Sequence, residues 1–498
     1  MTISTTIKSI QDIMRQDAGV DGDAQRISQL VWMMFLKIFD DNEEVYEWDE
    51  DYQSPIPNGL RWRDWAADDE GITGDGLLDF VNNRLFPTLK ALSFAPDSDA
   101  RGFIVQELFA DSYNYMKSGT LMRQVINKIN QIDFNNQKER HLFNDIYEKI
   151  LRDLQSAGNA GEYYTPRAVT QFMTDMVNPQ LGQVVLDPAC GTGGFLVCAL
   201  EHMKQQAGDA SGWQTMEANL RGIEKKPLPH MLAVTNLFLH EVTVPNIARD
   251  NALTRRPYRS YTEKDRVDVV LTNPPFGGTE EPGVESGFPA AYQTKETADL
   301  FLVLVMQLLK EGGQAAIVLP DGFLFGEGVK TRIKEKLLDE CNLHTIVRLP
   351  NGVFAPYTGI NTNLLFFRKG EPTEEIWYFA HPMPTDRKQY SKTRPISIEE
   401  FELEKAWWDN REENEHAWRV TRAEIEARGY NLDIKNPYEE EQKRVDPALL
   451  LARYEAQVAD MQATRTALKE ALAEALLNKT SEVLQTSEVY GSSDGGRV

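Results

Sequence analysis

The feature that most constrains the fold of this chain is an alternation of short apolar runs with helical stretches after Gly161. The apolar runs are 184–186, 220–223, 267–271, 314–319 and 345–349. Helical stretches separate them at 193–203, 229–240, 299–310 and 329–341. This alternation predicts an α/β fold with a doubly wound, mostly parallel sheet and helices on both faces, because each parallel strand needs a crossover to the next. Two later runs, 363–367 and 376–379, predict antiparallel edge strands.

The segments on either side of this region have a helical pattern. Before about Ile150, apolar residues recur three or four positions apart, as in Ile27, Leu30, Val31 and Met34, which predicts helices with one buried face. Past about Pro395 the chain is acidic and again helical in pattern. We therefore expect a helical domain at 1–155, an α/β domain at 156–395, a helical C-terminal region at 396–479 and a disordered tail at 480–498.

A stripe of apolar residues marks the C-terminal region. Its members fall on heptad positions a and d, interrupted by Arg465, and are Leu451, Tyr454, Val458, Met461, Leu468 and Leu472. Such a stripe predicts a coiled-coil seam. An ordinary helix folded back onto its own domain fits the pattern equally well.

Composition narrows the class of protein. The longest apolar stretch, around 301–309, is far below the roughly 18 residues of a membrane span, and the N-terminus lacks a signal-peptide core. We therefore expect a cytoplasmic protein without a membrane segment. The chain has 3 cysteines, too few and too scattered for a disulfide framework or a zinc site, so we expect no metal site.

The net charge of -23 is unusual for a protein that holds nucleic acid by itself, because such proteins present a basic face to the phosphates. If DNA is the substrate, a partner should supply much of the contact. Two basic clusters exist, one at Arg255, Arg256 and Arg259 and one between Lys330 and Lys336. The spacing of the second cluster is more typical of a solvated helix face than of a phosphate track.

A glycine-rich segment, Asp-Pro-Ala-Cys-Gly-Thr-Gly-Gly-Phe at 187–195, follows an apolar run and precedes a helical stretch. Open parallel sheets bind ligands in this context, where glycines let the backbone approach a cofactor. The loop residues are Gly191, Thr192, Gly193 and Gly194. A glycine loop alone could equally be a tight turn or a nucleotide site. Asp187 favours a ligand with a cationic amino group, and the chain has no phosphate-binding Lys-Ser or Lys-Thr pair after the loop.

Acidic residues follow the next two strands. Glu224 ends the run at 220–223, where a carboxylate can accept the hydroxyls of a ribose. It lies 30 residues after Gly194, more than the roughly 20 of dinucleotide sites, and the polar stretch 205–214 could be an insertion. With Lys226 it also forms half of a nuclease motif, but a nuclease leaves the glycine loop unexplained. Asp250 and Asn251 could hydrogen-bond an adenine ring of the cofactor.

The buried-strand pattern at 267–271 runs into Asn273, Pro274, Pro275 and Phe276. This sequence suits methylation of an exocyclic amine, whose lone pair is delocalised into a ring. The side-chain oxygen of Asn273 and the carbonyl of Pro274 can accept its two N–H groups, so that the lone pair points at a sulfonium methyl. Phe276 offers a surface on which a flipped base could stack. A rigid Asn-Pro-Pro turn is the structural alternative.

Taken together, these motifs resemble the modification (M) subunit of type I restriction-modification systems. The resemblance covers most of the chain and also includes Gly-Glu-Tyr-Tyr-Thr-Pro-Arg at 161–167 and Leu-Pro-Asn-Gly-Val-Phe at 349–354. The order of the motifs is that of the gamma group of amino-methyltransferases. It implies a Rossmann-like class I methyltransferase core, a helical N-terminal domain and C-terminal helices used for subunit assembly.

The resemblance also implies the roles of individual residues. S-adenosylmethionine would be bound by the glycine loop, by Glu224 and by the segment Glu162, Tyr163, Tyr164, Thr165, Pro166 and Arg167. Residues 273–276 would bind adenine and activate its N6 amine in double-stranded DNA. Two such subunits would join one specificity (S) subunit that reads the DNA, and a restriction (R) subunit could join them. The basic surface that this chain lacks could then lie on the specificity subunit.

Three rival functions are weaker. Methyltransferases for a protein glutamine or a ribosomal guanine usually have Tyr in place of Phe276 and lack large flanking domains. Enzymes that methylate cytosine N4 usually have Ser in place of Asn273. A non-catalytic scaffold would have a broken motif, and none is broken here.

Overall fold

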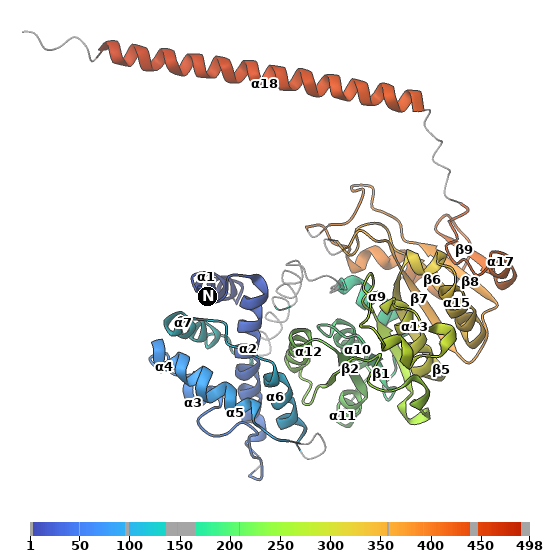
Figure 1. Ribbon diagram of the computed structural model, residues 1–498, viewed down its shortest axis with the longest axis horizontal. Coiled ribbons are helices and arrows are strands. Elements are labelled where there is room, and N and C mark those ends of the chain that lie inside the picture. The colour runs from blue at the N-terminus through green and yellow to red at the C-terminus, as the bar shows by residue number, and fades with distance from the viewer. Residues whose placement is uncertain are drawn as a thin grey trace, which may run out of the picture. The chain divides into compact units, whose positions relative to one another are not determined.

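The computed structural model describes residues 3–48, 50–94, 99–135, 147, 165–208, 210–355, 358–391, 393–438 and 447–489. The chain divides into two units, Met1–Asn436 and Pro437–Val498, each of which is described by itself (Figure 1).

The described residues of the first unit contain a 9-stranded sheet in the order β3-β2-β1-β4-β5-β7-β6-β8-β9 (Figure 1). The strands are β1 Val185–Asp187, β2 Leu220–Glu224, β3 Asn246–Arg249, β4 Val267–Thr272, β5 Leu309–Pro320, β6 Cys341–Arg348, β7 Thr362–Lys369, β8 Glu375–Ala380 and β9 Ala417–Thr421. Strands β1 to β6 and β8 share one direction, whereas β7 and β9 are antiparallel to their neighbours. The predicted doubly wound α/β fold is confirmed.

The crossover helices form two groups. One group is α10 Gly194–Lys204 and α12 Pro227–Leu239, with α11 Ala210–Asn219 beside α10; α9 Arg167–Val177, which precedes β1, also packs on α10. The other group is α13 Thr297–Leu308 and α15 Val329–Glu340. Strands β1 to β3 are added in one direction across the sheet and β4 to β5 in the other. Because such crossovers are right-handed, this reversal places the two groups on opposite faces and leaves a crevice between β1 and β4.

The predicted edge strands need correction. β7 is antiparallel as expected, but it lies between β5 and β6, and nearly all of its side chains are buried, as a central strand requires. β8 is parallel to β6. The antiparallel edge strand is β9, which lies in a region where the sequence pattern predicted only helices.

The C-terminal boundary also differs from the expected position at 395. Residues beyond it still belong to the first unit, as 3-10 helix η6 Ile398–Phe401, α16 Glu402–Trp408, β9 and α17 Arg422–Ala427. Their aromatic side chains Phe401, Trp407 and Trp418 are buried in its core. Most acids of this stretch face solvent, although Glu404 is buried, and the aromatic rings attach the stretch to the sheet.

In the second unit, the described residues form one helix, α18 Pro447–Val489, which extends into the segment predicted as a disordered tail. Residues 490–498 lie outside the described residues. The apolar stripe of this helix is open to solvent: Leu451, Tyr454, Met461, Leu468 and Leu472 are each more than half exposed. A helix that exposes this much apolar surface needs a partner to cover it.

The N-terminal helices form their own layer (Figure 1). They are α1 Ile3–Met14, α2 Asp23–Tyr46, α3 Trp62–Trp65, α4 Gly74–Asp79, the π-helical η1 Phe80–Leu85, α5 Phe86–Lys90, α6 Ala100–Ala110 and α7 Gly119–Ile129. Helix α2 packs on α12, where the rings of Phe35 and Phe39 lie 5.9 and 6.0 Å from that of Phe238. This contact joins the helical layer to the sheet domain.

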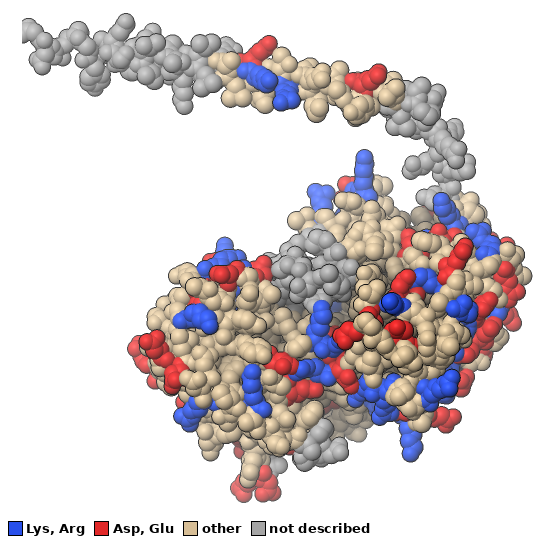
Figure 2. Space-filling model, viewed as in Figure 1, with Lys and Arg blue, Asp and Glu red and all other residues tan. Residues whose placement is uncertain are grey.

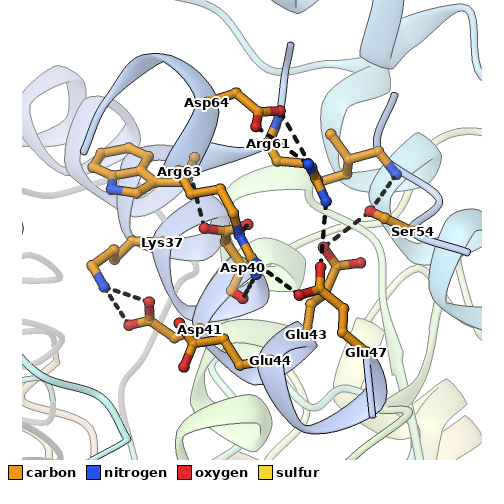
Figure 3. A network of polar contacts seen from close by, with 12 residues as sticks. Lys37, Asp40, Asp41, Glu43, Glu44, Glu47, Ser54, Arg61, Arg63 and Asp64 are labelled. Atoms are coloured by element: carbon orange, nitrogen blue, oxygen red, sulfur yellow. Dashed lines mark hydrogen bonds and ion pairs between the residues drawn. The ribbon is translucent and has the colours of Figure 1, made fainter. Parts of the chain in front are cut away.

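A polar network fixes the other side of α2 (Figure 3). Arg63 donates to Asp40 at 2.8 Å and to Glu47 at 2.7 Å, and so ties the start of α3 to two turns of α2. Glu43 accepts hydrogen bonds from Tyr52 and Ser54, at 2.6 and 2.9 Å. Burial raises the pKa of Asp40 and of Glu43, and these hydrogen bonds offset part of that shift. The network is structural, because its members bind one another.

Within the part of the chain that the structure describes, no helix is both long and apolar enough to cross a membrane. The same residues contain no group of three or more His, Cys, Asp or Glu side chains that could hold a metal ion.

Candidate active site

The topology brings the predicted site residues to one edge of the sheet. Strands β1, β2, β3 and β4 are parallel neighbours, and their carboxyl ends carry Asp187, Glu224, Asp250 and Asn273 in turn. The crevice between β1 and β4 opens at this edge, where doubly wound sheets bind their ligands.

The glycine loop is attached to β2. Glu224 accepts a hydrogen bond from the N–H of Gly191 at 2.9 Å and another from Lys226 at 2.8 Å. The N–H of Cys190 also donates to the carbonyl of Ile223 at 3.0 Å. A carboxylate has about four acceptor positions, so Glu224 can hold the loop and still accept hydroxyl groups of a ligand.

Two glycines of the loop have backbone conformations that L side chains rarely adopt. Gly191 has a φ of 54° and Gly193 a φ of 81°, and at Gly191 an added Cβ would meet no atom within 4 Å. The space beside Gly191 is therefore open, and the glycine is required by the turn and leaves room for a ligand.

Asp187 is 1% exposed and accepts hydrogen bonds at one oxygen, from Thr272 at 2.7 Å and from the N–H of Ala189 at 3.0 Å. Burial raises the pKa of Asp187 to about 7, and the two hydrogen bonds offset part of the effect. The negative charge of Glu224 raises it further. A buried carboxylate of this kind gains much from a cationic ligand, which would restore its ionised form.

Asn273 is oriented by a neighbour. Its Nδ2 donates to the hydroxyl of Thr165 at 2.9 Å, so the amide oxygen is fixed on the other side. That oxygen, Oδ1, is buried and has no hydrogen-bond partner among the described residues. Buried acceptors without a donor are rare and costly in folded proteins. The arrangement suits a substrate that brings an N–H group to Asn273.

The glycine loop and Asn273 line the same cavity. Its lining residues are Thr165, Thr170, Asp187, Ala189, Cys190, Gly191, Thr192, Gly194, Phe195 and Asn273. An amine held by Asn273 would thus lie beside a ligand bound at the loop, which is the arrangement that a transfer between two substrates needs.

Phe276 differs from the expectation of an open stacking surface. Its ring is 1% exposed and lies edge-on to Phe354, with ring centroids 6.1 Å apart and planes at 85°. A base could stack on Phe276 only after one of these rings moves. Phe354 belongs to the Leu-Pro-Asn-Gly-Val-Phe segment, which the sequence marked only through the family resemblance.

The segment predicted to fold over the cofactor is described in part. Glu162, Tyr163 and Tyr164 lie outside the described residues. Thr165 reaches Asn273, and Pro166 precedes α9. The guanidinium group of Arg167 donates to the carbonyl of Gly194 at 3.1 Å and so stabilises the end of the glycine loop.

Asp250 and Asn251 lie next to Glu224 but outside the shared cavity. The N–H of Asp250 donates to the carbonyl of Glu224 at 3.0 Å. The side-chain oxygen of Asn251 accepts from the N–H of Leu253 at 3.0 Å, so it closes a turn after β3. Their contact with a cofactor stays a prediction.

Sequence patterns gave no indication of Asn236, which also supports the loop. It lies on α12, is 1% exposed, and donates from Nδ2 to the carbonyl of Thr192 at 3.1 Å. An Asn among the apolar residues of a buried helix is the signal that could have identified it, because such a side chain needs a polar partner.

The basic cluster from Lys330 to Lys336 does not form the solvated face that its spacing suggested. Lys330 pairs with Asp299 and Glu296, and Lys334 is fully buried. The ammonium group of Lys334 donates to the carbonyls of Leu324 and Gly326, each at 2.8 Å. These cations hold the chain after β5 and do not form a phosphate track.

The chain is similar to known proteins both in sequence and in structure. A family model described as N-6 DNA Methylase matches residues 138–446, and one described as HsdM N-terminal domain matches residues 3–129. The EcoEI type I restriction enzyme methylase subunit of Escherichia coli is 58% identical over 486 residues, which are 96% of this chain and 99% of that protein.

Two solved structures are similar over most of their length. The modification subunit of a putative type I restriction enzyme from Vibrio vulnificus YJ016 has a TM-score of 0.79 and 44% identity, and covers 88% of this chain and 96% of its own. A structure on complex assembly and conformational transition of the type I R-M system has a TM-score of 0.80 and 36% identity, with 95% and 98% covered.

Proposed function

Because this chain belongs to the methylase subunits of type I restriction enzymes and carries an N-6 DNA methylase domain, we propose that residues 273–276 present the N6 amine of an adenine in duplex DNA to S-adenosylmethionine bound at 187–194. The single observation that carries this proposal is the buried Oδ1 of Asn273, an acceptor without a donor in the cavity that the glycine loop also lines.

The residues at the loop fit S-adenosylmethionine. Asp187 offers a buried carboxylate to the amino group of the methionine part, and the carboxylate of Glu224, beside the loop, is suited to accept the ribose hydroxyls. Gly191 leaves open space in front of the backbone. When bound, the cofactor supplies a methyl group on a sulfonium. By the family resemblance, Glu162 to Thr165 would also take part in binding it, and Asp250 and Asn251 would contact its adenine ring.

Asn273 then acts on the substrate amine. Its Oδ1 accepts one N–H of the amine, and the carbonyl of Pro274 accepts the other, which moves the nitrogen toward tetrahedral geometry. Thr165 keeps the amide of Asn273 in the orientation that this requires. Since the acceptors are fixed before the substrate arrives, little reorganisation is needed when the methyl group is transferred.

The family of this chain implies the rest of the proposed assembly, and its charge agrees with it. Figure 2 shows blue and red atoms interspersed over the visible face, without a continuous basic surface, and the net charge is -23. A specificity subunit therefore provides most of the DNA contact and the sequence recognition. Two copies of this chain join it, and the exposed stripe of α18 is the surface that a partner helix covers. A restriction subunit completes the nuclease.

The test is to co-express this chain with its specificity subunit and measure N6-methyladenine in host DNA. The Asn273→Ala variant should leave no modified adenine while the complex still binds S-adenosylmethionine. Asn342→Ala is the matched control, because Asn342 lies at the amino end of β6, whereas Asn273 follows the carboxyl end of β4. Modification by Asn273→Ala at the wild-type level would refute the proposal.

A further inference from the structure

One segment at the catalytic edge is not used by the site described above. Residues 381–396 connect β8 to η6. β8 is parallel to β6, with Ala380 opposite Arg348, and β6 shares the direction of β4. The segment therefore leaves the sheet at the edge where Asn273 lies.

This segment is fixed against the loop that carries Phe354. Tyr390 is 1% exposed, and its hydroxyl donates to Glu400 at 2.6 Å. Its N–H donates to the carbonyl of Asn351 at 3.2 Å. Gly352 lies so close that an added Cβ would be 2.5 Å from the carbonyl oxygen of Tyr390. A continuous set of contacts thus runs from Tyr390 through 351–354 to Phe276.

A second buried pair holds the base of the segment. His381 Nδ1 lies 2.6 Å from a carboxylate oxygen of Glu404, and both side chains are fully buried. The ring of His381 also lies 4.7 Å from that of Phe401. The segment is therefore anchored at its start and at Tyr390, while the residues between them reach the surface.

The surface part is basic in a chain that is strongly acidic. Between 381 and 396 the cations are Arg387, Lys388, Lys392 and Arg394, and the only acid is Asp386. We name residues 386–394 the basic loop. Lys388 and Arg394 are exposed, and among the described residues neither forms an ion pair; Lys392 lies outside those residues.

The charges of the basic loop lie close together. Arg387 donates to Asp386 at 2.9 Å, which lowers the pKa of Asp386, and the positive charge of Arg394 lowers it further. Arg394 and Ser391 also pair through their backbones, with both N–H···O distances at 3.1 Å. Arg387 thus binds Asp386, and Arg394 lies near enough to lower its pKa, so the described charges of the loop, three cations and one acid, leave a net positive charge.

We propose that the basic loop contacts the phosphates of duplex DNA beside the adenine that enters the site, and so contributes positioning residues to the methylation reaction. This inference rests on the proposed function. Base-modifying enzymes must hold the backbone of the strand from which a base is flipped, and Lys and Arg are the side chains that bind phosphates. The anchor through Tyr390 and 351–354 links this contact to the ring of Phe354 beside Phe276.

The experiment uses the complete methylase complex, this chain with its specificity subunit, after the wild type has been shown to methylate adenine. The variant is Arg387→Gln, Lys388→Gln and Arg394→Gln together. Its dissociation constant for a duplex carrying the target site is measured over a range of salt concentrations. Because each phosphate contact contributes about 0.9 to the slope of log K against log salt, the slope should fall in magnitude by about 2.7. A fourfold increase in salt would then weaken the variant about 40-fold less than the wild type.

The matched control removes the same charge elsewhere. Arg368, Arg419 and Arg422 lie on β7, β9 and α17, away from the basic loop, and their replacement by Gln should leave the slope unchanged. The charge-preserving variant Arg387→Lys and Arg394→Lys should keep the wild-type slope. Binding of S-adenosylmethionine should be equal in all four proteins.

An unchanged slope in the triple variant, with normal folding, would overturn the proposal. Loss of the specificity subunit from the purified complex would also overturn it, because the loop would then be a protein contact. Failure of the wild type to methylate adenine would instead count against the proposed function. The two inferences can therefore fail separately.

Discussion

The buried carboxylate of Asp187 makes cofactor binding depend on pH. In the free site the pKa of Asp187 is raised to about 7 by burial, so about half of the molecules carry the ionised form at pH 7. At pH 5.5 the ionised fraction falls to about 3%. If the ammonium group of S-adenosylmethionine binds only the ionised carboxylate, affinity should fall about 16-fold between pH 7 and pH 5.5.

The measurement is isothermal titration calorimetry of S-adenosylmethionine at half-unit intervals between pH 5.5 and 7. The α-amino group of the ligand stays protonated through this range, since such groups have a pKa near 7.7 to 8.0. Asp187→Asn is the control: it keeps an oxygen for Thr272 and Ala189, but it should bind more weakly at pH 7 and lose the pH dependence. A wild-type affinity that is constant over the range would refute the reasoning.

The same residue also predicts a change in stability. An unfolded Asp has a pKa of about 3.9, so the folded protein holds the proton of Asp187 more tightly than the unfolded chain. The free energy of unfolding should therefore fall as pH rises from about 4 to 7, by at most about 4 kcal/mol from this group. Asp187→Asn removes that cost. Without cofactor at pH 8, the variant should unfold at a higher urea concentration than the wild type, whereas an equal or lower midpoint would contradict this account.

Three further predictions concern other residues. Thr165→Val removes the acceptor for Nδ2 of Asn273, so kcat should fall about tenfold to a hundredfold while affinity for S-adenosylmethionine changes little; equal losses in both would argue against an orienting role. Glu224→Gln leaves one acceptor oxygen for the two backbone N–H groups that Glu224 now binds, those of Gly191 and Lys226, and should weaken cofactor binding about tenfold to a hundredfold. Glu217→Gln is its control, because Glu217 binds Thr243 and Trp213 away from the site and should leave cofactor affinity unchanged. Burial lowers the pKa of Lys334 to about 8, so above that pH the unfolded chain binds more protons than the folded protein. The free energy of unfolding of the wild type, relative to that of Lys334→Met, should therefore rise between pH 8 and pH 10 by at most about 3 kcal/mol. Urea titrations of both proteins measure this difference.

The sequence predicted the structure best where burial determines both the pattern of apolar residues and the position of a strand. Buried parallel strands such as β1 and β4 are apolar at most positions, and glycine or proline follows where the chain turns. The three segments that carry Asp187, Glu224 and Asn273 could therefore be placed at strand ends, whereas the pattern of β3, before Asp250, is too short and polar to mark a strand. Their meeting at one edge follows from the shared direction of the strands.

Non-local features could not be predicted in this way. The sequence of residues 362–369 does not show that they insert between β5 and β6, because this position depends on pairing with β5, which lies 42 or more residues earlier in the chain. β9 escaped notice because Glu and Asn residues surround its short buried part. The cover of Phe276 by Phe354, and the burial of Lys334, depend likewise on side chains that meet only in the folded state.

The central place of β7 has a consequence for how the chain acquires its structure during synthesis. β6 at Cys341–Arg348 leaves the ribosome before Thr362–Lys369, yet it has no neighbour on the β5 side until β7 has been made. Until then the place of β7 between β5 and β6 is empty, and the backbone groups of β5 and β6 that β7 will bind need hydrogen bonds. β7 is thus the strand that joins β1 to β5 with β6, β8 and β9. Ribosome-bound chains that end shortly before residue 362 should therefore be targets for chaperones, and those that end past β9 should not.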